Sequence, residues 1–242
     1  AQGLLKIDLQ ALPFHSYRYN TSFISDVMDH AGAKRAGFPA HWHIRSNSYE
    51  FRYAYDSKGS LYLTNNLFDF NEVYQYKLNQ LRSLKHIPDN ATYTAIMVLP
   101  NDEIRVYDEK KSSWFSWAQP DAVPERIQLD PESMRGVLLA GAKYIGGYTW
   151  MSTYNHGLLQ YDEQKRINRF GGKQTNGLMV ETLTEICPDP VDPNKFWIGT
   201  RGGGLILWDV KNGLQKIFTR DDGLPNNTIY SILPDKDGNL WC

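Results

Sequence analysis

The sequence is poor in cysteine and in net charge. Its 242 residues include two cysteines, and the formal net charge is −1 with both signs interspersed. Cys187, in an apolar stretch, and Cys242, at the last position, make neither a disulfide framework nor a metal set. A mixed, nearly neutral surface has no electrostatic footprint for nucleic acid or for a membrane. We therefore expect no nucleic-acid partner and no membrane contact.

Long apolar runs are also absent. The longest, around residues 136–142 and 95–100, are as long as strands, whereas a membrane-spanning helix needs about 20 apolar residues. No charged and apolar leader opens the chain, which indicates that a signal was removed or that the chain begins inside a longer protein. The start in mid-repeat, described below, favours the longer protein.

Histidines that could hold a metal are few. The six histidines are scattered apart from His41 and His43, which flank Trp42 and would share one face of a strand. This spacing suits a metal, but the sequence offers no third ligand beside them. We expect no metal and no cofactor.

What is present is a core-forming composition. Hydrophobic residues make up 41% of the chain, aromatic residues 13% and charged residues 22%. Such a composition predicts a globular protein that buries a sizeable core. Repeat architectures of this length are single units, so we expect one domain over residues 1–242.

A pattern, W-x-x-T-x-x-x-G-L-x-x-aromatic-D, occurs twice with an offset of 47 residues. The two copies align without a gap: Trp150, Thr153, Gly157, Leu158, Tyr161 and Asp162, and then Trp197, Thr200, Gly204, Leu205, Trp208 and Asp209. Each copy reads as a strand, a glycine turn and a second strand. A fixed period of this size is typical of repeat folds.

The two ends of the chain resemble two halves of this repeat. Residues 3–8 are similar to residues 157–162, and residues 239–242 stop inside the strand that contains Trp241. The regular spacing of Asp8, Asp56, Asp108, Asp162 and Asp209 extends the repeat through the middle of the chain. It predicts blades over residues 1–19 with 228–242, then 20–66, 67–120, 121–176 and 177–227.

A second interpretation of Asp56 competes with that spacing. The stretch from Asp56 to Tyr62 copies the stretch from Asp235 to Trp241, including the Asp-x-x-Gly spelling of a tight hairpin. The copy places the same hairpin in another repeat, whereas the even spacing places Asp56 at the end of the motif's second strand. We adopt the even spacing.

Four strands per repeat of about 50 residues, with little helical signal, predict an all-β fold. We expect a β-propeller with four-stranded antiparallel blades. About five blade-lengths are present, as a closed five-bladed ring or as part of a larger, seven-bladed propeller. The tryptophans that recur in phase would fill the space between blades: Trp150, Trp197 and Trp241.

Residues Asp222 to Trp241, with Trp197-Ile-Gly-Thr200 and Gly204-Leu205, resemble the two-component regulator propeller repeat. The likeness is specific over residues 148–241, fair over residues 3–32 and poor between them. Proteins with this repeat include the extracytoplasmic sensors of hybrid two-component histidine kinases of Bacteroidetes.

The resemblance implies a periplasmic, ligand-sensing domain of a signalling protein in which a membrane helix and a histidine kinase follow the sensor. It implies a small-molecule or oligosaccharide signal derived from a glycan, a homodimer formed through the propeller, and no catalysis by this region. The chain itself carries no kinase motif.

Ligands of propellers bind where the loops between second and third strands meet the loops between blades. A sugar site needs an aromatic face for the ring and polar groups for the hydroxyls. The side chains that meet this need are Tyr154, Asn155, His156 and Arg201. The repeated residues around them, including Thr153, Gly157, Thr200 and Gly204, are interpreted as scaffold. The inter-blade loops are expected at residues 173–176 and 220–222, and a phosphate cradle at Arg201 to Gly204 is excluded because a strand follows it, not a helix.

Two other functions stay open. A propeller glycoside hydrolase or lyase would need paired carboxylates, and Asp26, Asp29, Glu181 and Glu185 lie in or near the expected inner strands. A protein-interaction scaffold would use the same loop face for docking. Glycan binding, hydrolysis of a glycan panel and co-purification distinguish the three functions.

Overall fold

The computed structural model describes residues 3–7, 15–18, 51–65, 73–77, 80–84, 92–162, 164, 166–171, 178–235 and 237–242. These residues form four-stranded antiparallel sheets, the blades of an all-β propeller fold. The chain divides into two compact units, Ala1–Tyr19 with Glu132–Cys242 and Asn20–Pro131. Within the described ranges, no helix is long and apolar enough to cross a membrane.

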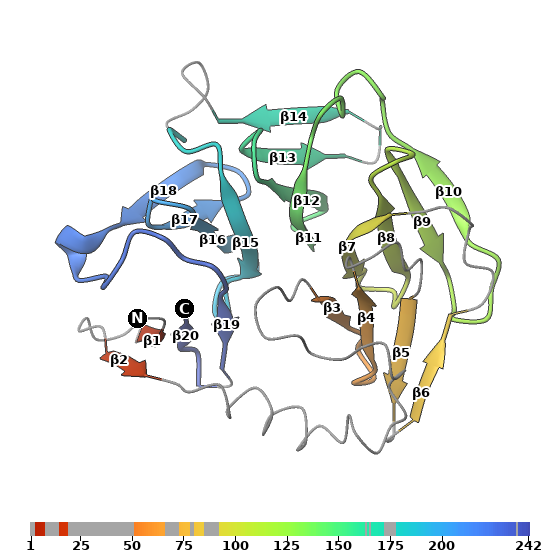
Figure 1. The fold of residues 1–242 in the computed structure, drawn as a ribbon, viewed down its shortest axis with the longest axis horizontal. Helices are drawn as coiled ribbons and strands as arrows, with labels where there is room; N and C mark the ends of the chain where they lie inside the picture. Colours follow the sequence, from red (N-terminus) through yellow and green to blue (C-terminus); the bar gives the residue numbers. More distant parts are fainter. Residues whose placement is uncertain are drawn as a thin grey trace. The chain divides into compact units, whose positions relative to one another are not determined.

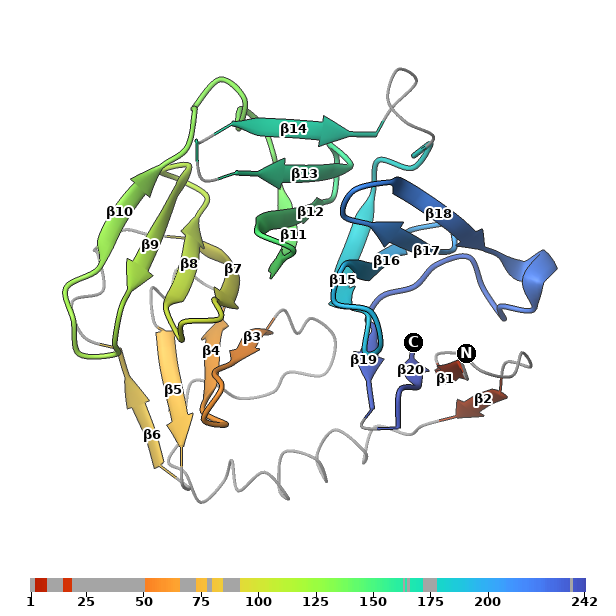
Figure 2. The same ribbon diagram turned by 180° about the vertical axis from the view of Figure 1, so that it is seen from behind.

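The first unit contains two blades that each consist of four consecutive strands (Figure 1). One blade consists of β11 (Leu139–Ile145), β12 (Tyr148–Thr153), β13 (Leu158–Tyr161) and β14 (Ile167–Phe170). The other consists of β15 (Leu183–Pro188), β16 (Lys195–Thr200), β17 (Leu205–Asp209) and β18 (Gly213–Phe218). A short 3-10 turn, η1 (Arg220–Asp222), follows β18. β11 and β15, the first strands of these blades, lie side by side (Figure 2).

A third sheet of this unit joins the two ends of the chain. Its order is β19-β20-β1-β2, from β19 (Leu233–Pro234), β20 (Leu240–Trp241), β1 (Gly3–Ile7) and β2 (His15–Arg18). Lys6 pairs with Trp241 and Ile7 pairs with Leu240 in antiparallel register. The halves at the two ends therefore complete one sheet, as the repeat in the sequence predicts.

The core of the unit lies between its blades and is aromatic. The ring centroid of Trp150 is 4.9 Å from that of Phe196 and 6.3 Å from that of Trp208, and all three side chains are fully buried. Trp197, on the opposite side of its strand from Phe196, packs in a separate cluster with Leu240 of the terminal sheet. Alternate residues of one strand thus pack against different blades, as the period of two requires.

The second unit contains two more blades. One consists of β3 (Phe51–Tyr55), β4 (Leu61–Asn65), β5 (Val73–Lys77) and β6 (Gln80–Ser83). The other consists of β7 (Tyr93–Val98), β8 (Ile104–Asp108), β9 (Ser113–Trp117) and β10 (Glu125–Gln128). The boundaries predicted after residues 66 and 120 fall inside these sheets and are wrong, because β4 pairs with β5 and β9 pairs with β10.

Asp56 explains the misplaced boundaries. Its Oδ1 accepts hydrogen bonds from the backbone of Lys58 and Ser60 at 3.0 and 2.7 Å, and its Oδ2 accepts one from the Tyr62 hydroxyl at 3.1 Å. Asp56 thereby closes the hairpin between the first and second strands of its blade. The even spacing was the wrong choice for this residue, and the interpretation by likeness to Asp235 is correct.

Asp235 closes the matching hairpin between β19 and β20. Its carboxylate accepts hydrogen bonds from the backbone of Asp237 and Asn239 at 3.0 and 2.8 Å and from the Trp241 indole at 3.0 Å. Asp162 and Asp209 act elsewhere, because they accept backbone hydrogen bonds in the turns after third strands. Two kinds of aspartate turn therefore share one sequence signature, which an even spacing cannot separate.

Candidate functional site

The loops after β12 and β16 have the same internal frame. The Thr153 hydroxyl donates to the carbonyl of Gly157 at 2.7 Å and accepts from the backbone of His156 at 2.8 Å. The Thr200 hydroxyl makes the same two bonds: it donates to the carbonyl of Gly204 at 2.7 Å and accepts from the amide of Gly203 at 2.9 Å. Because both threonines are fully buried, they hold the loop and do not contact a ligand.

Glycine is required at the end of each frame. Gly157 has φ 70° and Gly204 has φ 85°, a left-handed backbone that other residues rarely adopt. A Cβ on Gly157 would lie 2.5 Å from the carbonyl oxygen of Phe170, and a Cβ on Gly204 would overlap that of Phe218. The glycines thus let each loop approach the fourth strand of its own blade.

The segment 180–182, which leads into β15, lies between the two loops. The amide of Gly157 donates to the carbonyl of Glu181 at 2.9 Å, and the amide of Arg201 donates to the carbonyl of Thr182 at 3.0 Å. The structure therefore brings the loop of Tyr154, Asn155 and His156 and the loop of Arg201 to either side of one connecting segment. Both loops lie at the same edge of the sheets, since each joins a second strand to a third.

Asn155 holds its loop in place. Its side-chain Nδ2 donates to the carbonyl of Gly136 at 2.7 Å, and its Oδ1 accepts from the amide of Leu138 at 3.1 Å. Tyr154 is tied to the same segment by its backbone, whose amide donates to the carbonyl of Leu138 at 2.9 Å. Tyr154 is half-buried and Arg201 is exposed.

His156 is the centre of a small charged cluster. Nε of Arg169, on β14, donates to the carbonyl of His156 at 3.0 Å, and the same guanidinium lies 3.9 Å from the carboxylate of Glu181. Burial and then the charge of Arg169 lower the pKa of His156, while Glu181 opposes them. A neutral imidazole beside a guanidinium and a carboxylate can donate and accept hydrogen bonds.

Nδ1 of His156 is buried and has no hydrogen-bond partner within the described part of the chain. Buried polar atoms are nearly always satisfied, so this nitrogen marks a point where a ligand or a water can bind. Sequence reasoning missed Arg169 because it lies on a fourth strand, outside the repeated motif. It identified Glu181 only as a carboxylate for catalysis.

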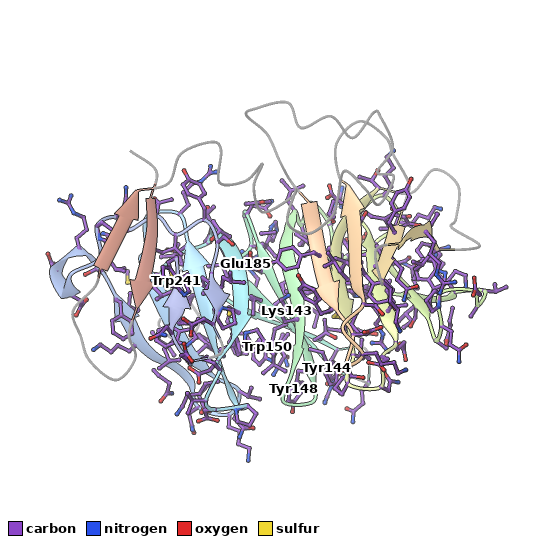
Figure 3. All side chains as sticks on the ribbon, turned by 90° about the horizontal axis from the view of Figure 1, so that it is seen from below. Lys143, Tyr144, Tyr148, Trp150, Glu185 and Trp241 are labelled. Carbon is purple, nitrogen blue, oxygen red and sulfur yellow. The ribbon has the colours of Figure 1, made fainter. Side chains whose placement is uncertain are left out.

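Only two of the four carboxylates proposed for catalysis, Glu181 and Glu185, lie within the described residues. Asp26 and Asp29 lie outside the described residues, as do His41 and His43. Glu185 lies on β15 (Figure 3), and its Oε2 accepts a hydrogen bond from the Ser231 hydroxyl at 3.5 Å. Among the residues that the structure describes, no group of three or more His, Cys, Asp or Glu is placed to hold a metal.

A cavity of about 570 Å³ lies in the same unit, away from the ligand-binding residues proposed from the sequence. It is lined by the rings of Trp150, Phe170 and Trp208, by residues 210–212 of the turn after β17 and by the first two residues of β18. The three rings belong to the aromatic core between the blades. This cavity therefore continues the packing seam of the blades, and its lining does not include His156, Tyr154 or Arg201.

A family model described as "Two component regulator propeller" matches residues 223–242. These residues include the turn that precedes β19 and the hairpin closed by Asp235. The resemblance predicted from the sequence is thus confirmed over this stretch. The comparison with curated proteins found no match.

Two similar solved structures come from B. thetaiotaomicron. One is the extracellular domain of a protein described as a hybrid two-component system, BT3049, with 16% identity, a TM-score of 0.57, and coverage of 81% of this chain and 27% of that chain. The other is the extracellular domain of BT4673, described as a one-component system, with 17% identity, a TM-score of 0.56, and coverage of 79% and 25%. The chain spans about a quarter of the length of these domains, and at these identities the likeness concerns the fold.

A third similar structure is an enzyme, virginiamycin B lyase from Staphylococcus aureus. The identity is 12% and the TM-score is 0.59, with coverage of 99% of this chain and 69% of that chain. The chain therefore shares its fold with these extracellular domains and with a lyase as well.

Proposed function

We propose that this chain is part of the ligand-sensing, periplasmic region of a hybrid two-component signalling protein and that it binds a glycan-derived oligosaccharide. The observation that carries the proposal is the shared loop frame. Thr153 with Gly157 and Thr200 with Gly204 repeat the same hydrogen bonds, while the side chains that the loops present differ. A constant frame with variable side chains is typical of a recognition surface.

The chemistry of these side chains suits a saccharide. Tyr154 offers an aromatic face, Arg169 and Glu181 offer charged hydrogen-bonding groups near the imidazole of His156, and Arg201 offers a guanidinium on the neighbouring loop. Sugar hydroxyls donate and accept, so they match a set that contains both kinds of group. The two guanidiniums favour an acidic saccharide, such as a uronate, over a neutral one.

Binding to a glycan array, followed by calorimetry with the best oligosaccharide, tests the proposal. Arg201→Ala and Tyr154→Ala should each weaken binding by roughly tenfold, which corresponds to about 1.4 kcal/mol. Lys211→Ala is the matched control for charge, because Lys211 is exposed in the turn after β17, at the end of the blade opposite the loop of Arg201. Unchanged affinity in both loop variants would refute the assignment of the loops.

A catalytic function is the second candidate, and the likeness to a lyase favours it. Glu181 and Glu185 are the carboxylates within the described ranges that the sequence singles out for this chemistry. An enzyme would release new reducing or unsaturated ends from a glycan panel. Loss of that activity in Glu185→Gln, with binding retained, would assign the chain to the catalytic class.

The oligomeric state is part of the same proposal, because we expect the sensor to act as a homodimer. Light scattering of the purified chain should then give twice the monomer mass. A monomeric mass at micromolar concentrations would contradict dimerisation through this region.

A further inference from the structure

The two cysteines of the chain belong to one apolar cluster, in which Cys187 is buried and Cys242 is partly buried. Cys187, on β15, is 3% exposed, and it packs with Trp197, Ile232 and Leu240, against which Cys242 is also packed. The two residues are the only cysteines among 242. Both thiols are reduced in this structure.

Backbone register explains why they meet. Leu233 pairs with Trp241, so the next step along the same antiparallel ladder brings Cys242 towards Ile232. The neighbouring Ser231 donates a hydrogen bond to Glu185, at 3.5 Å, and Glu185 and Cys187 are two residues apart on β15. The residue after β20 and the C-terminal half of β15 are therefore both close to residues 231 and 232.

We propose that Cys187 and Cys242 form an intramolecular disulfide that clasps the blade β15–β18 to the sheet β19-β20-β1-β2. The bond joins residues 55 positions apart in sequence. The terminal sheet depends on β20 pairing with β1, so the clasp holds the strand that connects the two ends of the chain.

The oxidation takes place by thiol–disulfide exchange with a small disulfide or with the disulfide of an oxidoreductase. One thiolate attacks the reagent and releases one thiol, and the second protein thiolate displaces the other. The net change is two protein thiols and one reagent disulfide converted to one protein disulfide and two reagent thiols.

The folded state restricts when this reaction occurs. Burial raises the pKa of Cys187 to about 12, with Glu185 adding to the shift, and burial together with Cys187 raises the pKa of Cys242 to about 12. At neutral pH the thiolate that attacks is then scarce, so exchange is slow in the closed fold and rapid while the strands are still open. The clasp therefore forms during folding and resists reduction afterwards.

Refolding the full chain from urea in a buffer of oxidised and reduced glutathione tests the inference. Thiol titration in denaturant should give two thiols before refolding in this buffer and none after it. Peptide mapping should find the peptides of Cys187 and Cys242 joined. The oxidised chain should melt about 10 °C higher than the reduced chain, because the cross-link lowers the conformational entropy of the unfolded chain.

Single variants make the outcome decisive. Cys187→Ser and Cys242→Ser should each keep one thiol or carry one glutathione, and neither should gain in melting temperature under oxidising conditions. If the wild type also carries only glutathione adducts or intermolecular cross-links, or keeps two free thiols, the proposed clasp is wrong. If Cys187→Ser fails to fold, Cys187→Ala, which preserves the apolar site, serves in its place.

Discussion

Gly157 and Gly204 show how single residues decide the loop frame. Gly202, in the same loop as Gly204, also has a left-handed backbone, with φ 94°, but a Cβ there would meet nothing within 4 Å. Gly204→Ala should therefore lower the free energy of unfolding by about 3 kcal/mol or more, and Gly202→Ala by about 1–2 kcal/mol. Urea denaturation measures both, and equal losses would show that the contact with Phe218 is unimportant.

The imidazole of His156 should respond to pH in a defined direction. Its pKa in the folded chain is below its ordinary value of about 6.5, because burial and Arg169 disfavour the charged ring. The unfolded chain therefore takes up this proton first. The contribution of His156 to stability is fully present above pH 6.5 and is lost as the pH falls through the lower pKa of the folded state.

NMR titration of the imidazole measures this pKa directly. Arg169→Gln should raise the pKa by removing the nearby positive charge, and Glu181→Gln should lower it. A wild-type midpoint above 6.5, or two variants that shift it in the same direction, would contradict the described cluster.

At the residue scale, the sequence identified the positions that repeat but not their partners. Thr153, Gly157, Thr200 and Gly204 stand out because two copies of the motif share them. Arg169 does not, since its hydrogen bond is to a backbone carbonyl of the loop after β12, which leaves no pattern in the sequence. Partners of this kind are set by tertiary packing.

The hairpin of β19 and β20 shows how one side chain organises an element. Burial acts to raise the pKa of Asp235, but hydrogen bonds from the Asn239 side chain, the Trp241 indole and two backbone amides outweigh it and lower the pKa to about 2. Asp235→Ala should lower the urea midpoint of unfolding, because it leaves the amides and the indole of the hairpin without their acceptor. Asp237→Ala, at an exposed aspartate in the same turn, should leave that midpoint almost unchanged.

A double-mutant cycle isolates the contact with Trp241. Trp241→Phe removes the indole donor, so its effect should be smaller when Asp235 is already alanine. Strict additivity of the two substitutions would show that the hydrogen bond does not stabilise the hairpin.

At the element scale, the sequence was most informative where motif and strand order coincide. The loops after β12 and β16 lie between second and third strands, as the aligned copies of the motif predict. Between residues 48 and 131 two signals competed, the aspartate spacing and the likeness of residues 56–62 to residues 235–241. Asp56 follows a first strand and Asp108 ends a second strand, whereas Asp162 and Asp209 follow or end third strands. Local turn chemistry is alike in all of these places, so it cannot report the position of a turn in a blade.

For the whole molecule, the pairing of β1 with β20 is the contact that joins distant parts of the chain. Lys6 pairs with Trp241 on one side and with His15 on the other. Lys6→Pro removes an amide from the middle of this sheet and should increase hydrogen exchange over residues 233–241. Lys6→Ala keeps the amide and should leave that exchange unchanged, and equal effects of both variants would argue against the pairing.

The whole chain spans about a quarter of the extracellular domains that it resembles. Its part in signalling, as proposed here, is recognition of the ligand by the loop edge of the blades β11–β14 and β15–β18. In a binding experiment, the cavity lined by Trp150, Phe170 and Trp208 is the surface against which effects at the loops are compared.

Hydrogen exchange of the chain with and without the best oligosaccharide from the glycan array tests the central claim most directly. We predict protection over residues 154–157, 180–182 and 201–204, with no change over residues 209–214 at the opposite edge. Protection confined to residues 209–214 would contradict the account. So would unchanged exchange at all three loop segments when the oligosaccharide is added.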